Sequence, residues 1–283
     1  MTVKLLTGKD VADAMFKDLM PIVKKLDPKL VIVQVGDNPA SESYIRQKIK
    51  SCDAVGMRHE HLHLPETVTK EELFAAIKRL NEDTDVTGFI VQLPLPDHLQ
   101  PLIPQIIRAI DPKKDVDGFT AYNIGKTLLS KEFEHLPPAT PSGIIALLDF
   151  YGYGDVTGKE VVIVNHSNVV GKPLAVMLLN RNATVTVCHA ATKDLASHTR
   201  RADILISAVG KPKLITKDMV KPGAVVIDVG ITRTKDGLTG DVDFEKVKEI
   251  ASAITPVPGG VGPLTVASLI RNTVRAKQRQ LEA

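Results

Sequence analysis

Short apolar runs separated by segments of helical periodicity constrain this chain most strongly. The run at residues 30–35 is rich in β-branched residues and ends in the turn-forming sequence Gly-Asp-Asn-Pro, which is typical of a buried parallel strand followed by a turn. Segments with apolar residues at helical spacing precede and follow it. The alternation predicts β–α–β units, and therefore parallel strands with helices packed on both faces of a sheet.

The predicted elements of the first half alternate along the chain. Helices are expected at residues 10–26, 41–55 and 70–80, and strands at residues 30–35, 58–64 and 88–93. Pro21 is expected to kink or split the first helix, because proline lacks the N–H that a helix interior uses. Residues 112–141 then depart from the pattern with Gly, Pro and charged residues. This composition indicates an active-site loop and a crossing between domains.

A second series of strands and helices begins near residue 140. Helices are expected at residues 144–150, 172–179 and around 195, strands at 161–164, 184–188, 204–208 and 224–229, and a final helix at 264–281. Steps of roughly 20 residues are typical of a dinucleotide-binding domain. We predict an α/β protein with an N-terminal βαβ domain at 1–139, completed by residues 264–283, and a Rossmann-like domain with a parallel sheet at 140–263.

Composition excludes several classes of protein. The 283 residues carry a net charge of +3, which is too balanced for a protein that binds mainly nucleic-acid phosphates. Cys52 and Cys188 match no metal-ligand or redox spacing, and this favours a reducing cytosol. No run approaches the ~18 apolar residues of a membrane span, and no signal peptide is evident. We expect a cytoplasmic protein without nucleic-acid or membrane partners.

Tyr44 and Lys48 form the first candidate pair for chemistry. They lie four residues apart on a predicted helix, so their side chains share one face. A lysine that loses hydration there has a lowered pKa and suits proton transfer. The alternative is an exposed lysine on a half-buried helix.

Two further polar groups lie where predicted strands or turns end. Pro94 and Pro96 impose an extended exit after Gln92, which places its amide at the carboxyl edge of the sheet, where it is either an orienting group or a simple polar strand end. Asp115 and Asp117 lie on a turn, and their carboxylates can accept hydrogen bonds from a ligand's N–H groups. The turn lacks the other oxygen ligands of a calcium loop.

Three histidines alternate on a predicted strand. His59, His61 and His63 would lie along one face at intervals that a metal site could use. Their neighbours Arg58 and Glu60 are charged, however, so a solvated strand face explains the pattern more simply. We therefore predict no metal.

The second domain opens with features of a phosphate-binding turn. Asn165, His166, Ser167 and Asn168 follow an apolar strand, and the Gly-Lys-Pro sequence beginning at Gly171 indicates a helix start. The first turn of that helix is expected to offer free N–H groups to phosphate. The sequence GxGxxG is absent.

The next strand points to the identity of the dinucleotide. It ends at Cys188, His189 and Ala190, where an NAD-binding unit would normally carry an acidic residue. NADP is therefore favoured over NAD, and the positive groups that would serve it are those of His166, His189, Lys193 and Arg200.

Three glycine-containing segments follow. The sequences at residues 207–212 and 228–231, the second ending at Ile231, predict contacts with the nicotinamide side of the cofactor. Residues 255–265 read TPVPGGVGPLT. Proline and glycine interleaved in this way favour a fixed, open loop close to a ligand, although they also gather in ordinary loops.

Six segments in this order resemble the bifunctional methylenetetrahydrofolate dehydrogenase/methenyltetrahydrofolate cyclohydrolase family, with matching spacing over almost the whole chain. They are YIRQK at 44–48, VQLPLP at 91–96, DVDGF at 115–119, ATPSG at 139–143, SNVVGKP at 167–173 and TPVPGGVGPLT at 255–265. The resemblance implies two α/β domains flanking a cleft, folate in the first domain, NADP in the second, and a homodimer.

The resemblance also implies roles for individual residues. Lys48 would be the central catalytic residue, Tyr44 would lie along the folate rings, Gln92 would orient the lysine, and Asp117 rather than Asp115 would bind the pterin. The loop containing Pro256, Gly259 and Gly260 would border the folate. The implied cofactor-binding residues are Asn165, His166, Ser167, Gly171, His189, Ala190 and Ile231.

The implied reactions are NADP-dependent oxidation of 5,10-methylenetetrahydrofolate to 5,10-methenyltetrahydrofolate and its hydrolysis to 10-formyltetrahydrofolate. The sequence departs from the family pattern at Asn165-His166, where Gly-Arg is frequent, and at Ala190, where serine is frequent. Both positions bear on the 2′-phosphate, so NAD is kept as the alternative cofactor. Two other functions stay open: a shikimate-dehydrogenase-like NADP-linked enzyme and a non-catalytic folate-binding protein.

Overall fold

The computed structural model describes residues 3–235 and 237–282. The chain forms two compact units. Unit 1 contains the residues up to Asp13, Thr127–Phe133 and Thr140–Thr265, and unit 2 contains Ala14–Lys126, Glu134–Ala139 and the residues from Val266 on. None of the helices in the described part of the chain has the length and apolar character needed to span a bilayer.

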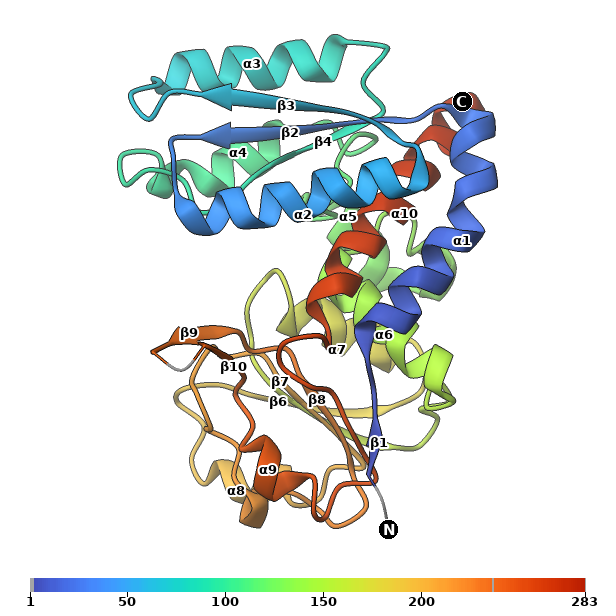
Figure 1. The fold of residues 1–283 in the computed structure, drawn as a ribbon, viewed down its shortest axis with the longest axis vertical. Coiled ribbons are helices and arrows are strands. Elements are labelled where there is room, and N and C mark those ends of the chain that lie inside the picture. Colours follow the sequence, from blue (N-terminus) through green and yellow to red (C-terminus); the bar gives the residue numbers. More distant parts are fainter. Residues whose placement is uncertain (1–2, 236, 283) are drawn as a thin grey trace. The chain divides into compact units, whose positions relative to one another are not determined.

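Unit 2 is built on a three-stranded parallel sheet. Its order is β3 (Arg58–Leu64), β2 (Lys29–Val35), β4 (Gly88–Val91). Helix α2 (Pro39–Val55) lies on one face, and α3 (Lys70–Glu82) lies on the other (Figure 1). The layers are those predicted from the alternating pattern.

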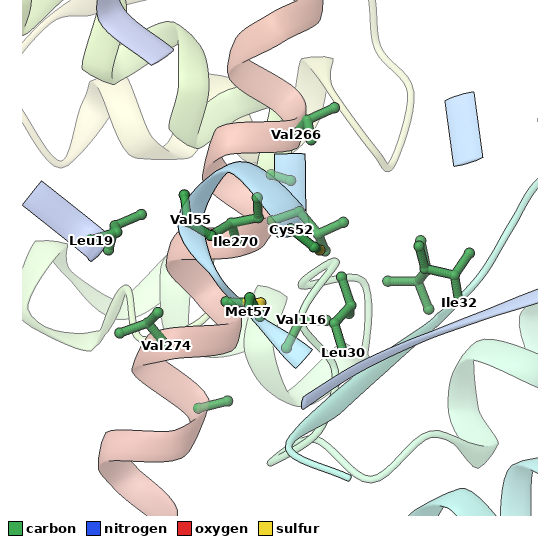
Figure 2. Close-up of a cluster of buried hydrophobic side chains, with 14 of the residues drawn as sticks. Leu19, Leu30, Ile32, Cys52, Val55, Met57, Val116, Val266, Ile270 and Val274 are labelled. Atoms are coloured by element: carbon green, nitrogen blue, oxygen red, sulfur yellow. The ribbon is translucent and has the colours of Figure 1, made fainter. Parts of the chain in front are cut away.

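The central strand β2 supplies both cores of unit 2, because successive side chains of a strand point to opposite faces. Leu30 and Ile32 join a core with residues of α2 and of α10 (Gly262–Glu282). Val31 and Val33 join a second core with residues of α3 and α4 (Ile103–Ala109). Figure 2 shows the first core, in which α10 contributes apolar side chains along one side. The sheet is therefore buried on both faces.

Unit 1 is built on a six-stranded sheet in which every pair is parallel. The order is β1 (Lys4–Leu5), β11 (Ala253–Ile254), β8 (Val225–Asp228), β7 (Ile204–Ser207), β5 (Glu160–Val164), β6 (Thr184–Cys188). The chain passes from β5 to β6 on one side and then to β7 on the other, so the order reverses beside β5. Ligands of open α/β sheets bind at such a reversal, outside the carboxyl ends of the strands.

The remaining elements connect these sheets. The helices are α1 (Gly8–Leu26), α5 (Ala121–Leu129), α6 (Ala139–Tyr151), α7 (Gly171–Leu179), α8 (Leu195–Thr199) and α9 (Phe244–Val247). Short 3-10 helices lie at Gln100–Leu102, Lys131–Phe133 and Lys217–Met219, and β9 (Thr232–Thr234) forms an antiparallel hairpin with β10 (Gly237–Thr239).

The predicted α/β class is confirmed, with local differences. Helix α1 continues through Pro21 instead of splitting there. Pro21 and Lys17, whose carbonyl loses its partner, are both exposed, so water can satisfy the freed carbonyl. Unit 1 includes the residues up to Asp13 because β1 pairs with β11. Strand β1 has only two residues, which is too short for an alternating pattern to reveal it in the sequence.

Candidate active site

Helix α2 brings Lys48 to the carboxyl edge of the three-stranded sheet. Gln92 follows β4 directly, and the Nζ of Lys48 donates a hydrogen bond to its Oε1 at 2.8 Å. Lys48 is only 9% exposed, whereas Tyr44, one turn earlier, is 43% exposed. The structure therefore joins the predicted lysine to the predicted amide and leaves the aromatic ring open to a ligand.

The surroundings of Lys48 favour its neutral form. Burial lowers the pKa of the ammonium group, and the charge of Asp117 opposes this shift. Gln92 is itself held in place, because its Nε2 donates to the carbonyl oxygen of Leu93 at 2.7 Å. Its Oε1 is thereby fixed as the acceptor facing the amine.

The two carboxylates of the DVDG turn have different surroundings. Asp115 is buried, and its carboxylate accepts hydrogen bonds from the N–H groups of Gly118, Phe119 and Thr120. The carboxylate of half-buried Asp117 accepts no hydrogen bond from any described residue. Burial raises the pKa of Asp117, and the charge of Lys48 opposes the shift. Asp117 is thus the carboxylate that a ligand can use.

The three histidines of β3 have separate partners. The Nε2 atoms of His59, His61 and His63 lie 2.9 Å from Asp53 Oδ1, 2.8 Å from Gln34 Oε1 and 3.2 Å from the Gly36 carbonyl oxygen. Among the residues that the structure describes, no three His, Cys, Asp or Glu side chains are grouped as metal ligands would be. The rings serve hydrogen bonds within unit 2.

In unit 1, Asn165 organises the turn after β5. Its Oδ1 accepts from the N–H groups of Ser167 at 2.8 Å and Gly171 at 3.0 Å, and its Nδ2 donates to the carbonyl of Ala208 beyond β7. The Lys172 N–H donates to Ser167 O. The expectation of free N–H groups in the first turn of α7 was therefore wrong: the turn folds back and uses them, and Pro173 has none.

His166 and His189 lie together at the ends of β5 and β6. Their ring centroids are 5.0 Å apart, and both residues are exposed, as is Ala190. Arg200 does not join them, because its guanidinium Nε donates to the carbonyl of Asp218 at 2.7 Å. The imidazole pair thus lies at the carboxyl ends of the two strands beside which a Rossmann-like unit holds the ribose.

Two buried carboxylates, Asp241 and Asp228, shape the loops after β7 and β8, a role that sequence analysis predicted for neither. Asp241 accepts hydrogen bonds from Ser207 Oγ at 2.8 Å, Val209 N at 2.6 Å and Lys211 N at 2.8 Å, and so fixes the loop after β7. Asp228 accepts from Gly230 N at 3.0 Å, and also from two N–H groups of the segment containing Asp241. The glycine before Ile231 indicated the second loop in the sequence, but nothing in the sequence indicated that the Asp228 carboxylate holds this loop in place.

The proline-glycine loop packs closely against the start of α1. Gly8 donates its N–H to Gly259 O at 2.8 Å, and a Cβ on Gly8 would lie only 1.7 Å from Gly260 O. The loop therefore has a fixed path past Pro256 within unit 1.

Unit 1 has a parallel sheet whose strand order reverses beside a polar turn, and unit 2 is a separate β–α–β unit with a buried lysine. These features define a two-unit α/β enzyme of the nicotinamide-dependent dehydrogenase class. Residues 6–117 match the family "Tetrahydrofolate dehydrogenase/cyclohydrolase, catalytic domain", and residues 138–281 match its "NAD(P)-binding domain". The chain belongs to the tetrahydrofolate dehydrogenase/cyclohydrolase family.

Similar proteins agree over their full length. The chain is 50% identical to the bifunctional protein FolD of Sulfurihydrogenibium sp., covering 98% of each chain. It superposes with a TM-score of 0.93 on the bifunctional methylenetetrahydrofolate dehydrogenase/cyclohydrolase of Campylobacter jejuni, at 44% identity over 98% of this chain and 99% of that one. The enzyme of Trypanosoma brucei, complexed with NADP cofactor and inhibitor, matches with a TM-score of 0.93 at 37% identity over 99% of each.

These comparisons confirm the predicted family and its pair of activities. A shikimate dehydrogenase of Aquifex aeolicus matches with a TM-score of 0.51 at 13% identity, over 90% of this chain and 98% of that one. That similarity shows a shared fold alone, so the shikimate-dehydrogenase-like alternative is not favoured.

Replacing Asp241 by Asn should weaken dinucleotide binding. The amide loses one acceptor atom and brings an NH₂ group against buried donors, and an unpaired buried group costs roughly 1–3 kcal/mol. We expect about ten-fold weaker NAD(P) binding in a fluorescence titration, with folate binding unchanged. Asp243→Asn is the matched control, because Asp243 is a buried carboxylate at the start of α9 that forms an ion pair with Lys246 instead of binding the loop after β7. Equal affinities for the two variants would contradict the bracing role.

Proposed function

We propose that this protein catalyses two successive steps of folate one-carbon metabolism. The first is NADP-dependent oxidation of 5,10-methylenetetrahydrofolate to 5,10-methenyltetrahydrofolate, and the second is hydrolysis of that product to 10-formyltetrahydrofolate. The observation that carries the proposal is the buried amine of Lys48, held at 2.8 Å by Gln92 at the carboxyl edge of a parallel sheet. Family membership supplies the substrate class.

Lys48 acts as the proton acceptor in the hydrolysis. Water attacks the methenyl carbon, whose positive charge is shared by two folate nitrogens, and the proton that the water loses passes to the neutral amine. The bond between that carbon and N5 then breaks, N5 takes up a proton, and the carbon stays on N10 as the formyl group. One N–H of the amine is engaged by Gln92, which leaves the nitrogen lone pair free to accept a proton from the attacking water. Burial, which lowers the pKa of Lys48, keeps a larger share of the amine in this neutral form.

Tyr44 and Asp117 bind the folate. The ring of Tyr44 is exposed on the face of α2 that carries Lys48, so it can pack along the pterin and benzoyl rings. The carboxylate of Asp117, free of hydrogen bonds from described residues, can accept the pterin N–H groups. Pro256, Gly259 and Gly260 are proposed to border the folate, because the hydrogen bond from Gly8 to Gly259 gives their loop a fixed path.

The residues of unit 1 fit NADP. When bound, the nicotinamide accepts the hydride that the methylene carbon loses. Asn165, Ser167 and Gly171 shape the phosphate turn at the switch point of the sheet. His166 and His189 are proposed to hold the 2′-phosphate, with Ala190 beside them, and residues 189–193, which follow β6 directly, include no acidic side chain to repel it. Ile231 is exposed at the end of the braced loop after β8 and would contact the nicotinamide.

We propose a cytoplasmic homodimer. Strand β6 is an edge of the six-stranded sheet, and Val187 on it is 37% exposed. Such an edge can pair with the same strand of a second copy. Both cysteines are buried free thiols, which is consistent with a reducing compartment.

Replacing Lys48 by Met should abolish hydrolysis while leaving the fold intact, because methionine keeps the apolar stem and removes the amine. We expect a loss of at least about 100-fold in cyclohydrolase kcat, with unchanged NADP affinity, measured by following the absorbance of the methenyl compound. Lys50→Met alters an exposed lysine two residues along the same helix and should retain full activity. Retained hydrolysis in Lys48→Met would remove Lys48 from this role.

The pH dependence of hydrolysis should report the amine. The rate should rise as Lys48 loses its proton, with a midpoint in kcat/KM below the ordinary lysine range, because burial lowers this pKa. The charge of Asp117 raises the same pKa, so Asp117→Asn should move the midpoint to still lower pH. A midpoint that moves upward in Asp117→Asn would contradict the assignment.

The histidine pair should determine the choice of cofactor. We expect His166→Ala and His189→Ala each to weaken NADP binding by about ten-fold through the lost contact with the 2′-phosphate, with NAD binding unchanged, in parallel fluorescence titrations. His198→Ala, on helix α8, is the control. A wild-type preference for NAD, or equal losses with both cofactors, would overturn the NADP assignment.

A further inference from the structure

The segment that carries Asp117 is held from two directions within unit 2. On one side, the carboxylate of Asp115 accepts hydrogen bonds from the backbone that follows Asp117. On the other side, a side chain of the C-terminal helix α10 grips the backbone that precedes it. Both anchors act on the residues next to Asp117.

Asp115 fixes the backbone after Asp117. Its Oδ1 accepts from Gly118 N at 2.9 Å and Phe119 N at 3.1 Å, and its Oδ2 accepts from Thr120 N at 2.8 Å and Asn123 Nδ2 at 2.9 Å. These contacts satisfy the carboxylate with donors in well-defined directions. The turn therefore cannot rotate without losing several buried hydrogen bonds.

Asn272 fixes the backbone before Asp117. This fully buried residue of α10 donates from Nδ2 to Val116 O at 2.9 Å and to Pro137 O at 2.8 Å. Its Oδ1 is buried without a hydrogen-bond partner among the described residues. Burying an amide oxygen without a partner lowers the stability of the fold. The amide of Asn272 carries this cost while its Nδ2 holds the backbone on either side of the Asp117 turn.

The hydrogen bonds of Asp115 and Asn272 on the two sides of Asp117 are called the clamp below, and the two residues next to Asp117 add packing contacts to it. Val116 packs in the core that also holds Cys52 of α2 and Ile270 of α10 (Figure 2). Gly118 has a φ of +76°, and a Cβ there would lie 2.5 Å from Leu136 O. The residues on both sides of Asp117 are thus fixed by packing as well as by hydrogen bonds, and Cys52 lies one helical turn from Lys48 on α2.

We propose that Asp115 and Asn272 are positioning residues, which together hold the Asp117 carboxylate in the direction required for it to bind the pterin and to act on Lys48. The proposal rests on the proposed function of Lys48 and Asp117. It assigns a part in substrate binding to the C-terminal helix through a single amide. The charge of Asp115 also contributes to the raised pKa of Asp117, which links the anchor electrostatically to the group that it positions.

The test compares Asp115→Asn and Asn272→Leu with Thr273→Val as the matched control. Thr273 is the next residue of the same helix and is fully buried, but its hydroxyl donates only to Leu269 O within α10. We expect both clamp variants to raise the KM for methylenetetrahydrofolate by about ten-fold with an unchanged KM for NADP. In Asn272→Leu, which changes no charge, the pH midpoint for hydrolysis should move downward, as in Asp117→Asn, because a displaced Asp117 no longer raises the pKa of Lys48. Thr273→Val should change none of these values.

A role in stability alone would lower the melting temperature without moving either KM or the pH midpoint, and that result in the clamp variants would overturn the proposal. Asn123→Ala removes one of the donors to Asp115 and gives the same readouts at smaller amplitude if the stronger variants do not fold. Calorimetric binding of the folate substrate to the wild-type protein separates the two proposals. No binding by wild type would count against the proposed function, whereas wild-type binding that the clamp variants retain in full would count against positioning.

Discussion

The structure depends on keeping one lysine amine out of water beside a fixed amide oxygen. A charged ammonium group is costly to bury unless it is paired, and Lys48 has an uncharged partner, Gln92, within hydrogen-bond distance. Gln92 is in position because β4 ends at Val91, so the next residue lies at the carboxyl edge of the sheet. Helix α2 follows β2 at the same edge. The parallel sheet thus brings two distant segments together at the site proposed for proton transfer.

Both units use buried carboxylates to shape backbone loops. In unit 2, Asp115 gathers the turn that presents Asp117. In unit 1, Asp241 and Asp228 do the same for the loops after β7 and β8. Fixed loops reduce the ordering cost that a ligand would otherwise bear on binding. The side chains that remain open, Asp117 and Tyr44 in unit 2 and the histidine pair in unit 1, are those proposed to meet ligands.

Much of this arrangement was predictable from local patterns. The spacing of Tyr44 and Lys48 predicted that they share one face of a helix, and the prolines after Gln92 predicted that its amide lies at the carboxyl edge of the sheet. That Gln92 contacts Lys48 was implied by the resemblance alone. The pattern of Asp115 and Asp117 did not distinguish a structural carboxylate from a ligand group, and only the resemblance favoured Asp117. What separates them is the set of N–H groups that the folded turn directs at Asp115.

Other features could not be predicted because they join residues far apart in the chain. Asn272 donates a hydrogen bond to the carbonyl of Val116, which is 156 residues earlier. Asp241 accepts one from Ser207, which is 34 residues earlier. The amides at the start of α7 looked free in the sequence, but Asn165 folds back onto one of them. Arg200 looked like a phosphate partner and instead binds the Asp218 carbonyl. Helical or strand periodicity carries no information about such contacts.

Direct titration of the Lys48 amine by NMR, with isotope-labelled lysine and Lys48→Met to assign the signal, tests the central claim. We predict that the Lys48 signal titrates at a lower pH than those of the exposed lysines, because burial lowers its pKa. A Lys48 signal that titrates together with the exposed lysines would contradict the account, since the amine would then be charged and solvated at the pH at which the enzyme works.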